Sequence, residues 1–365
     1  NFLQIISNPA AITISDCCPQ LTNKNSDAQT EKDESLIKML YYIFKRVLIL
    51  IPLLFFISVL IFVVIQLPPG DFLDIYIFSL KQSGIELSPD VKQSLERQYG
   101  LDQPYWYQYY RWISNIILRG DFGYSFGWNQ PVNNILEERV LITLIISIAS
   151  IFLVWIISIP IAVISATRQY SLFDYLFTFV GFVGLAVPNF LLALMLAWFV
   201  YEKTGLAITG LFSKEYMDQG WSFDKFIDLL KHIWLPVVIV GVAGTAGMIR
   251  VLRATLLDEL RKQYVITARA KGVSEIKLLM KYPIRIALNP VFSTIGWLLP
   301  ATFSGEVIVG IVLNLQTIGP VLMRATLTQD MYLIGSIVLI LSFLTVIGTL
   351  ISDILLAWLD PRIRY

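Results

Sequence analysis

The chain is poor in the side chains from which most catalytic and metal sites are built. Its 365 residues include one histidine, His232, and two cysteines, the adjacent pair Cys17 and Cys18. Neighbouring cysteines rarely form a disulfide because the geometry is strained, and no zinc-ligand spacing is present. The sequence has neither an HExxH motif nor a GxxxxGK[ST] phosphate loop. It therefore predicts no catalytic residue, no metal site and no bound cofactor in this chain.

Charge is also scarce. Charged residues make up 15 % of the chain and hydrophobic residues 56 %, whereas ordinary globular domains carry about 25 % charged residues. The formal net charge is +1, so nothing in the total charge indicates binding to nucleic acid. The deficit indicates that much of the surface faces lipid.

Long stretches without a charged residue are present instead. A helix needs about 20 apolar residues to cross the hydrocarbon core of a bilayer. The candidate stretches are 47–67, 140–167, 175–201, 232–249, 286–305 and 332–352. A soluble helical protein would need polar residues recurring along each stretch to form a wet face, and these stretches lack them. The predicted fold class is an all-α polytopic membrane protein with six transmembrane helices.

Lysine and arginine placement orients the bundle. The connection 250–285 holds nine basic residues and three acidic ones, and cytoplasmic loops carry the excess of positive charge. With six spans, this connection and both termini fall on the cytoplasmic side. The loops 68–139 and 202–231 fall on the outside. The aromatic residues of the first outer loop suit anchoring at the headgroup level or docking of a partner better than direct binding of a solute.

The first 38 residues are polar and show no secretory signal pattern. Met39 precedes the first span and is the expected natural start. Residues 1–38 are expected to be a disordered cytoplasmic tail or an artefact of the gene model, and residues 39–365 the transmembrane domain.

The basic connection contains the most informative pattern, which predicts two short helices joined by a tight turn. Lys271-Gly272 is a helix stop, because glycine takes a left-handed backbone at little cost. Ser274 is expected to accept a hydrogen bond from the first amides of the next helix, and Glu275 complements the positive helix terminus.

The second of these helices has an apolar stripe of Ile276, Leu279 and Met280. This chain has no soluble domain that would cover the stripe. A partner protein is the favoured occupant, and packing against the chain's own bundle is the alternative.

The run Tyr-Val-Ile-Thr-Ala-Arg-Ala-Lys-Gly at 264–272 resembles the coupling-helix loop of permeases from binding-protein-dependent ABC importers, in the peptide/nickel branch. The segments 69–71, 99–104, 119–125 and 359–365 resemble other parts of that family, so the likeness extends over nearly everything after Met39. It implies a type I importer permease fold. It also implies that the residues contacting the ATPase are Tyr264, Thr267, Ala268, Arg269, Ala270, Lys271, Gly272, Ser274 and Glu275.

The resemblance implies partners as well. They are a second homologous permease subunit, two ATPase subunits that hold ATP and Mg, an external substrate-binding protein and the lipid of a bacterial inner membrane. The chain itself is expected to be non-catalytic and to move oligopeptides or a similar solute. Many peptide permeases have a glutamate near Gly310 and a Pro-Gly pair near Thr317, and both are missing here. Oligosaccharides and nickel complexes therefore remain alternatives.

Three further residues are candidates for lining a transport pathway. Pro188 and Asn189 lie inside the third predicted span, where proline frees a backbone carbonyl, and Glu306 lies at the outer end of the fifth. An autonomous secondary transporter is the alternative class. It would be expected to have paired ionisable groups in mid-span or an inverted repeat, and neither is clear in this sequence.

Overall fold

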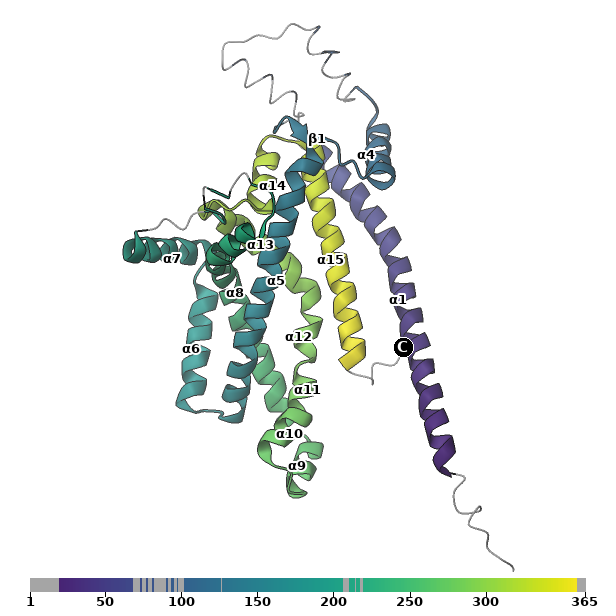
Figure 1. The fold of residues 1–365 in the computed structure, drawn as a ribbon, viewed down its shortest axis with the longest axis vertical. Coiled ribbons are helices and arrows are strands. Elements are labelled where there is room, and N and C mark those ends of the chain that lie inside the picture. The colour runs from purple at the N-terminus through teal and green to yellow at the C-terminus, as the bar shows by residue number, and fades with distance from the viewer. Residues whose placement is uncertain are drawn as a thin grey trace, which may run out of the picture. The chain divides into compact units, whose positions relative to one another are not determined.

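The computed structural model describes residues 20–67, 102–125, 127–205, 210–213, 215–216 and 219–359, with scattered positions between 68 and 101. The chain divides into one unit of residues Leu50–Ile363 and another of Asn1–Ile49 with Arg364–Tyr365. The architecture that follows is that of the first unit, shown in chain order in Figure 1.

The described residues are almost entirely helical. A single two-stranded hairpin, β1 (Tyr124–Ser125) with β2 (Gln130–Pro131), is the sheet of this part of the chain. The longer helices are α1 (Gln20–Gln66), α4 (Tyr105–Arg119), α5 (Val132–Thr167), α6 (Leu172–Ala186), α7 (Asn189–Thr204), α8 (Phe223–Leu260), α13 (Ile295–Val312), α14 (Ile318–Leu327) and α15 (Met331–Leu359). The shorter ones are α9 (Gln263–Ala270), α10 (Glu275–Lys281), α11 (Pro283–Ala287) and α12 (Asn289–Ser293).

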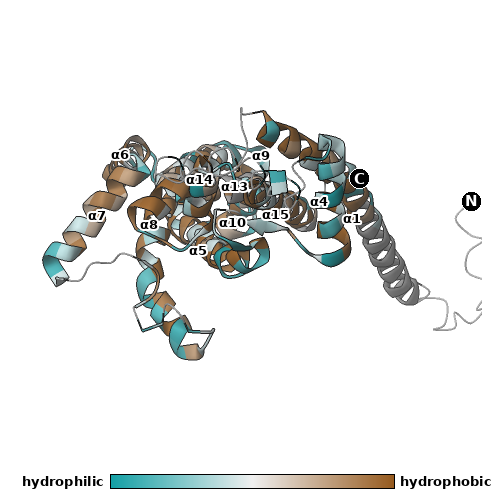
Figure 2. Ribbon diagram, turned by 90° about the horizontal axis from the view of Figure 1, so that it is seen from above, coloured by the Kyte–Doolittle hydropathy of each residue, from teal (hydrophilic) through white to brown (hydrophobic). Residues whose placement is uncertain are grey.

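Four of these helices are long and apolar enough to cross a bilayer. They comprise Ile43–Gln66 of α1, all of α5, all of α8 and Met331–Ala357 of α15. Seen from above in Figure 2, the helices of the bundle are coloured mostly as hydrophobic. The predicted all-α, multi-pass fold class is therefore confirmed.

The third predicted span, 175–201, is not one continuous helix. It is divided between α6 and α7, which are bent by 102° relative to each other. Val187 has an extended backbone with ψ of 120°, and Pro188 has no backbone N–H to continue the helix. The bend therefore follows from the proline.

The fifth predicted span, 286–305, is also divided. Its residues belong to α11, α12 and α13, and Pro290 stands within the first turn of α12. Counted by length and composition, the described residues therefore contain four spans, or five if α6 and α7 form one, against the six predicted.

Residues 20–38, expected to be a disordered tail or an artefact of the gene model, form the first part of α1. Residues 1–19 lie outside the described residues.

The centre of the bundle is the contact between α5 and α8. Their apolar faces form two buried clusters, one that includes Ile142 and Ile239 and one that includes Val154 and Met248. Gly241 lets the helices approach closely, since a Cβ there would lie 3.0 Å from Leu153. These two helices connect the two ends of the bundle.

Candidate functional site

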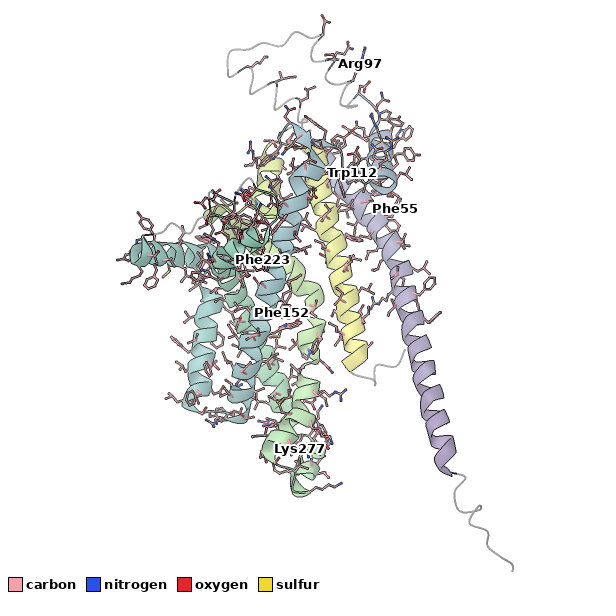
Figure 3. The ribbon with its side chains drawn as sticks, viewed as in Figure 1. Phe55, Arg97, Trp112, Phe152, Phe223 and Lys277 are labelled. Atoms are coloured by element: carbon pink, nitrogen blue, oxygen red, sulfur yellow. The ribbon has the colours of Figure 1, made fainter. Side chains whose placement is uncertain are left out.

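The basic segment after α8 folds into a compact structure of two short helices, α9 and α10, here called the knob (residues 259–282). Val265, Ala268 and Leu278 are buried between the two helices, and Tyr264 and Tyr282 pack against them. Figure 3 labels Lys277 in the knob, which projects from the lower end of the bundle in that view. The predicted pair of short helices is confirmed.

The turn of the knob depends on Gly272. Its φ angle is +75°, and the Val273 N–H donates to the Ala268 carbonyl at 3.3 Å while the Gly272 N–H donates to the Arg269 carbonyl at 3.0 Å. These two bonds define a Schellman motif, in which the residue after the helix adopts the left-handed conformation. No atom would lie within 4 Å of a Cβ at Gly272, so the backbone conformation alone favours glycine.

Ser274 corrects one detail of the prediction. It stands at the N-cap of α10, but its hydroxyl accepts no hydrogen bond from the first amides of that helix. Its ψ angle is 141°, whereas Ser171 and Ser222, which do cap α6 and α8 with their side chains, have ψ angles of 164° and 166°. At Ser274 the contact to α10 comes from the backbone, whose carbonyl accepts the Leu278 N–H at 2.8 Å.

An ion pair spans the turn. Arg269 donates from Nε to Glu275 Oε1 at 2.6 Å and from a terminal nitrogen to Oε2 at 3.1 Å. The hydrogen bond and charge of Arg269 hold the pKa of the Glu275 carboxyl below its ordinary value. Both side chains are more than half exposed, so the pair is screened by water and salt.

Glu259, the penultimate residue of α8, fixes the knob to that helix. Glu259 is 5 % exposed, and its carboxylate accepts hydrogen bonds from Tyr264 Oη and Lys262 Nζ, both at 2.5 Å. Sequence reasoning counted this residue only as one acid in a basic loop. The three-residue spacing from Glu259 to Lys262 was the available signal.

Leu279 links the knob to the long helices. It packs on a cluster that includes Ala166 at the end of α5, Leu256 near the end of α8, and Ile284 of α11. Part of the apolar stripe therefore packs on the chain's own bundle, which was the alternative to a partner protein. A displacement of α10 would therefore reach α5 and α8 directly.

The remaining apolar side chains of the knob are exposed. Ile276 is 79 % exposed, Met280 65 % and Ile266 47 %. Of the predicted coupling residues, Ala268 is buried and Tyr264 is half-buried. The exposed ones are Thr267, Arg269, Ala270, Lys271, Gly272, Ser274 and Glu275. The structure thus gathers the predicted residues on one small protrusion that presents apolar and charged groups side by side.

The three pathway candidates are not brought together in the same way. Pro188 is exposed and Asn189 half-buried at the bend between α6 and α7. Glu306 lies in α13 and is 1 % exposed, with no hydrogen-bond partner for Oε1 within the part of the chain that the structure describes. Their role in a pathway stays a prediction.

The described residues thus form a polytopic helical bundle with a basic two-helix protrusion at one end. Residues 158–365 match the family described as binding-protein-dependent transport system inner membrane component, and residues 39–149 match the N-terminal region of such membrane components. The chain belongs to this family, the permeases of binding-protein-dependent ABC importers.

Individual relatives extend the same likeness over nearly the whole chain. The oligopeptide transport system permease protein AppB of Bacillus subtilis is 35 % identical, over 90 % of this chain and 100 % of its own length. The glutathione transport system permease protein GsiC of Escherichia coli is 32 % identical over the same shares. The dipeptide transport system permease protein DppB of Alkalihalophilus pseudofirmus is 30 % identical, again over 90 % and 100 %.

Proposed function

We propose that this chain is the non-catalytic permease subunit of a peptide importer and that an ATPase subunit binds its knob. One observation carries the proposal. The knob exposes apolar side chains beside a turn, and the shape of this turn depends on its backbone alone. Exposed Ile276 and Met280 lie one helical turn apart on α10, which suits insertion into a groove of a partner. Leu279 belongs to the same apolar stripe but is partly buried, and it packs on the cluster at the ends of α5 and α8.

Peptides are the proposed solute. The three relatives described above are named for the transport of oligopeptides, dipeptides and glutathione, all of which contain peptide bonds. Oligosaccharides and nickel complexes remain the competing solutes.

The proposed assembly contains this chain, a second homologous permease, two ATPase subunits that bind ATP and Mg, and an external binding protein that delivers the solute. Its proposed location is the bacterial inner membrane, with the knob and both termini in the cytoplasm. The nine basic residues between 250 and 285 support this orientation, because positive residues are retained on the cytoplasmic side.

The experiment is uptake of labelled peptide by proteoliposomes that contain the full assembly with ATP inside. Uptake that requires both ATP and the binding protein is expected. Unlabelled peptide should compete for uptake, and an oligosaccharide should not. Uptake that continues without ATPase subunits would contradict the importer mechanism. Competition by the oligosaccharide alone would move the substrate assignment to sugars.

The knob is tested in the same assay by Gly272→Val. A β-branched residue strongly resists a φ of +75°, so we expect peptide-stimulated ATP hydrolysis and uptake to be lost while the chain still inserts into the membrane. Gly272→Asn should retain more activity, because asparagine tolerates the left-handed conformation best after glycine.

Gly220→Val is the matched control for this variant. A Cβ at Gly220 would also have no atom within 4 Å, but Gly220 has no positive φ. The control variant should leave uptake unchanged. Normal uptake by Gly272→Val would exclude the proposed role of the turn.

A further inference from the structure

Helix α4 has a composition unlike that of any other described helix in this chain. Its 15 residues, YWYQYYRWISNIILR, include six aromatic side chains and two arginines, and no acidic residue. The helix ends at Gly120, which adopts the left-handed conformation. Tryptophan and tyrosine are enriched where a protein surface meets the headgroup level of a bilayer, because each has an apolar body and a polar tip.

One side of α4 is fixed to the ends of two membrane-crossing helices. Tyr109 Oη and Ser58 Oγ of α1 are 2.8 Å apart, and the Tyr109 and Phe62 rings pack edge to face at 5.5 Å. Trp112 is 5 % exposed and lies against Phe62 and against Gly335 near the start of α15. Figure 3 shows Trp112 at the end of the bundle away from the knob. These contacts fix α4 beside the C-terminal part of α1 and the first turns of α15.

The other side of α4 is apolar and exposed. Trp106 is 71 % exposed, Tyr110 63 % and Ile117 73 %, and their spacing of four and seven residues places them along one face of the helix. The exposed side of α1 carries apolar residues of the same kind, including Phe56, which is 69 % exposed.

We propose that α4 is an interfacial helix that lies on the outer leaflet, with Trp106, Tyr110 and Ile117 immersed at the headgroup level and Arg111 and Arg119 directed to anionic headgroups. Continuity supports lipid as the occupant, since α4 packs on α1, a helix that already crosses the bilayer with most of its surface uncovered by this chain. Charge complementarity supports it too, because a helix with arginines and no acids suits an anionic surface. Long arginine side chains can reach the phosphates while the rings remain below them.

The consequence is mechanical. A helix anchored in the interface and packed on α1 and α15 would keep these two spans at a fixed depth while the knob end moves. This role does not depend on which solute is carried.

The test measures the depth of individual α4 residues in lipid nanodiscs that contain the full-length chain. Cys17→Ser and Cys18→Ser remove the native thiols. Spin labels are then attached separately at Trp106→Cys, Tyr110→Cys and Ile117→Cys. Collisions with oxygen report lipid exposure and collisions with a soluble nickel chelate report water exposure. Phe56→Cys in α1 is the control for lipid, and the exposed Asp102→Cys just before α4 is the control for water.

We expect the ratio of oxygen to nickel collisions at all three α4 sites to shift from the Asp102 value toward the Phe56 value. The shift should be larger in phosphatidylglycerol than in phosphatidylcholine, and Arg111→Gln with Arg119→Gln should remove that difference. Ratios equal to that of Asp102 would overturn the proposal, as would protection that appears only when a binding protein is added. Equal depth in the two lipids would overturn the role of the arginines.

Discussion

The turn of the knob and the opposite end of the bundle are held together by different kinds of contact. At the knob, the ion pair across the turn is between Arg269 and Glu275, whose side chains are 51 % and 58 % exposed. At the other end, here called the hairpin end (β1, β2, α14 and the starts of α5, α8 and α15), two charged residues are buried. Asp330 is 0 % exposed and Lys225, in the first turn of α8, is 2 % exposed.

Each buried charge at the hairpin end has several partners. Asp330 accepts hydrogen bonds from Ser125 Oγ at 2.5 Å, the Gly127 N–H at 3.0 Å and the Leu333 N–H at 3.3 Å. Lys225 donates to Glu138 at 2.8 Å and to the Gln219 carbonyl at 2.7 Å. Removing one partner of such a group is costly because the other is left buried and unsatisfied.

This difference in the contacts of the charged groups indicates which end can move. The hairpin end joins hairpin, α5, α14 and α15 through an apolar cluster that includes Ile135, Ile318 and Ile337, and its buried charges have fixed partners. The knob has a core of three residues, an exposed ion pair across its turn, one buried carboxylate at Glu259 and one apolar link to the long helices. We interpret the hairpin end as the fixed platform and the knob as the element that a partner displaces.

The largest expected effect comes from overpacking the platform. A Cβ at Gly319, in the first turn of α14, would lie 2.6 Å from the Cα of Val307 in α13, so the two backbones would have to separate. We expect Gly319→Ala to destabilise the chain by about 3 kcal/mol, measured as a lower unfolding temperature in detergent.

Gly247→Ala is the matched control, because Gly247 of α8 has no atom within 4 Å of a Cβ. Alanine favours a helix over glycine, so this variant should be neutral or slightly more stable. If Gly319→Ala were as stable as Gly247→Ala, the close contact between α13 and α14 would be wrong.

A smaller loss is expected from Asp330→Asn. The amide group has one oxygen where the carboxylate has two, so its NH₂ would face either Ser125 and Gly127 or Leu333, which are themselves donors. We expect a loss of about 2 kcal/mol, with faster hydrogen exchange in the hairpin and at the start of α15. Unchanged exchange there, with slower or faster exchange in the knob instead, would reverse the assignment of the two ends.

The sequence predicted the knob better than it predicted the spans. The helix stop at Gly272 depends on local backbone chemistry, and the motif at 264–272 is long enough to be specific. The bundle class followed from long apolar stretches, which need no knowledge of packing.

What the sequence did not predict depended on tertiary contacts or on breaks within apolar runs. Hydrophobicity does not distinguish one span of 27 residues from two helices bent at Pro188, nor a continuous fifth span from α11, α12 and α13. The burial of Asp330 and Lys225 could not be predicted from the sequence either, because their partners Ser125 and Glu138 are distant along the chain.

The smallest expected effect is that of Glu275→Gln in the knob. Because the pKa of Glu275 is lowered in the folded chain, the ion pair stabilises the knob above the carboxyl's ordinary pKa and is lost as the pH falls through the lowered pKa. We therefore expect slightly faster hydrogen exchange in α9 and α10 of the variant at neutral pH and low salt. The difference from the parent chain should vanish in acid and in high salt.

Exchanging the two charges, Arg269→Glu with Glu275→Arg, should restore much of the protection, since either arrangement pairs across the turn. A large loss that persists in high salt would mean that the exposed pair, and not the Gly272 backbone, holds the knob together.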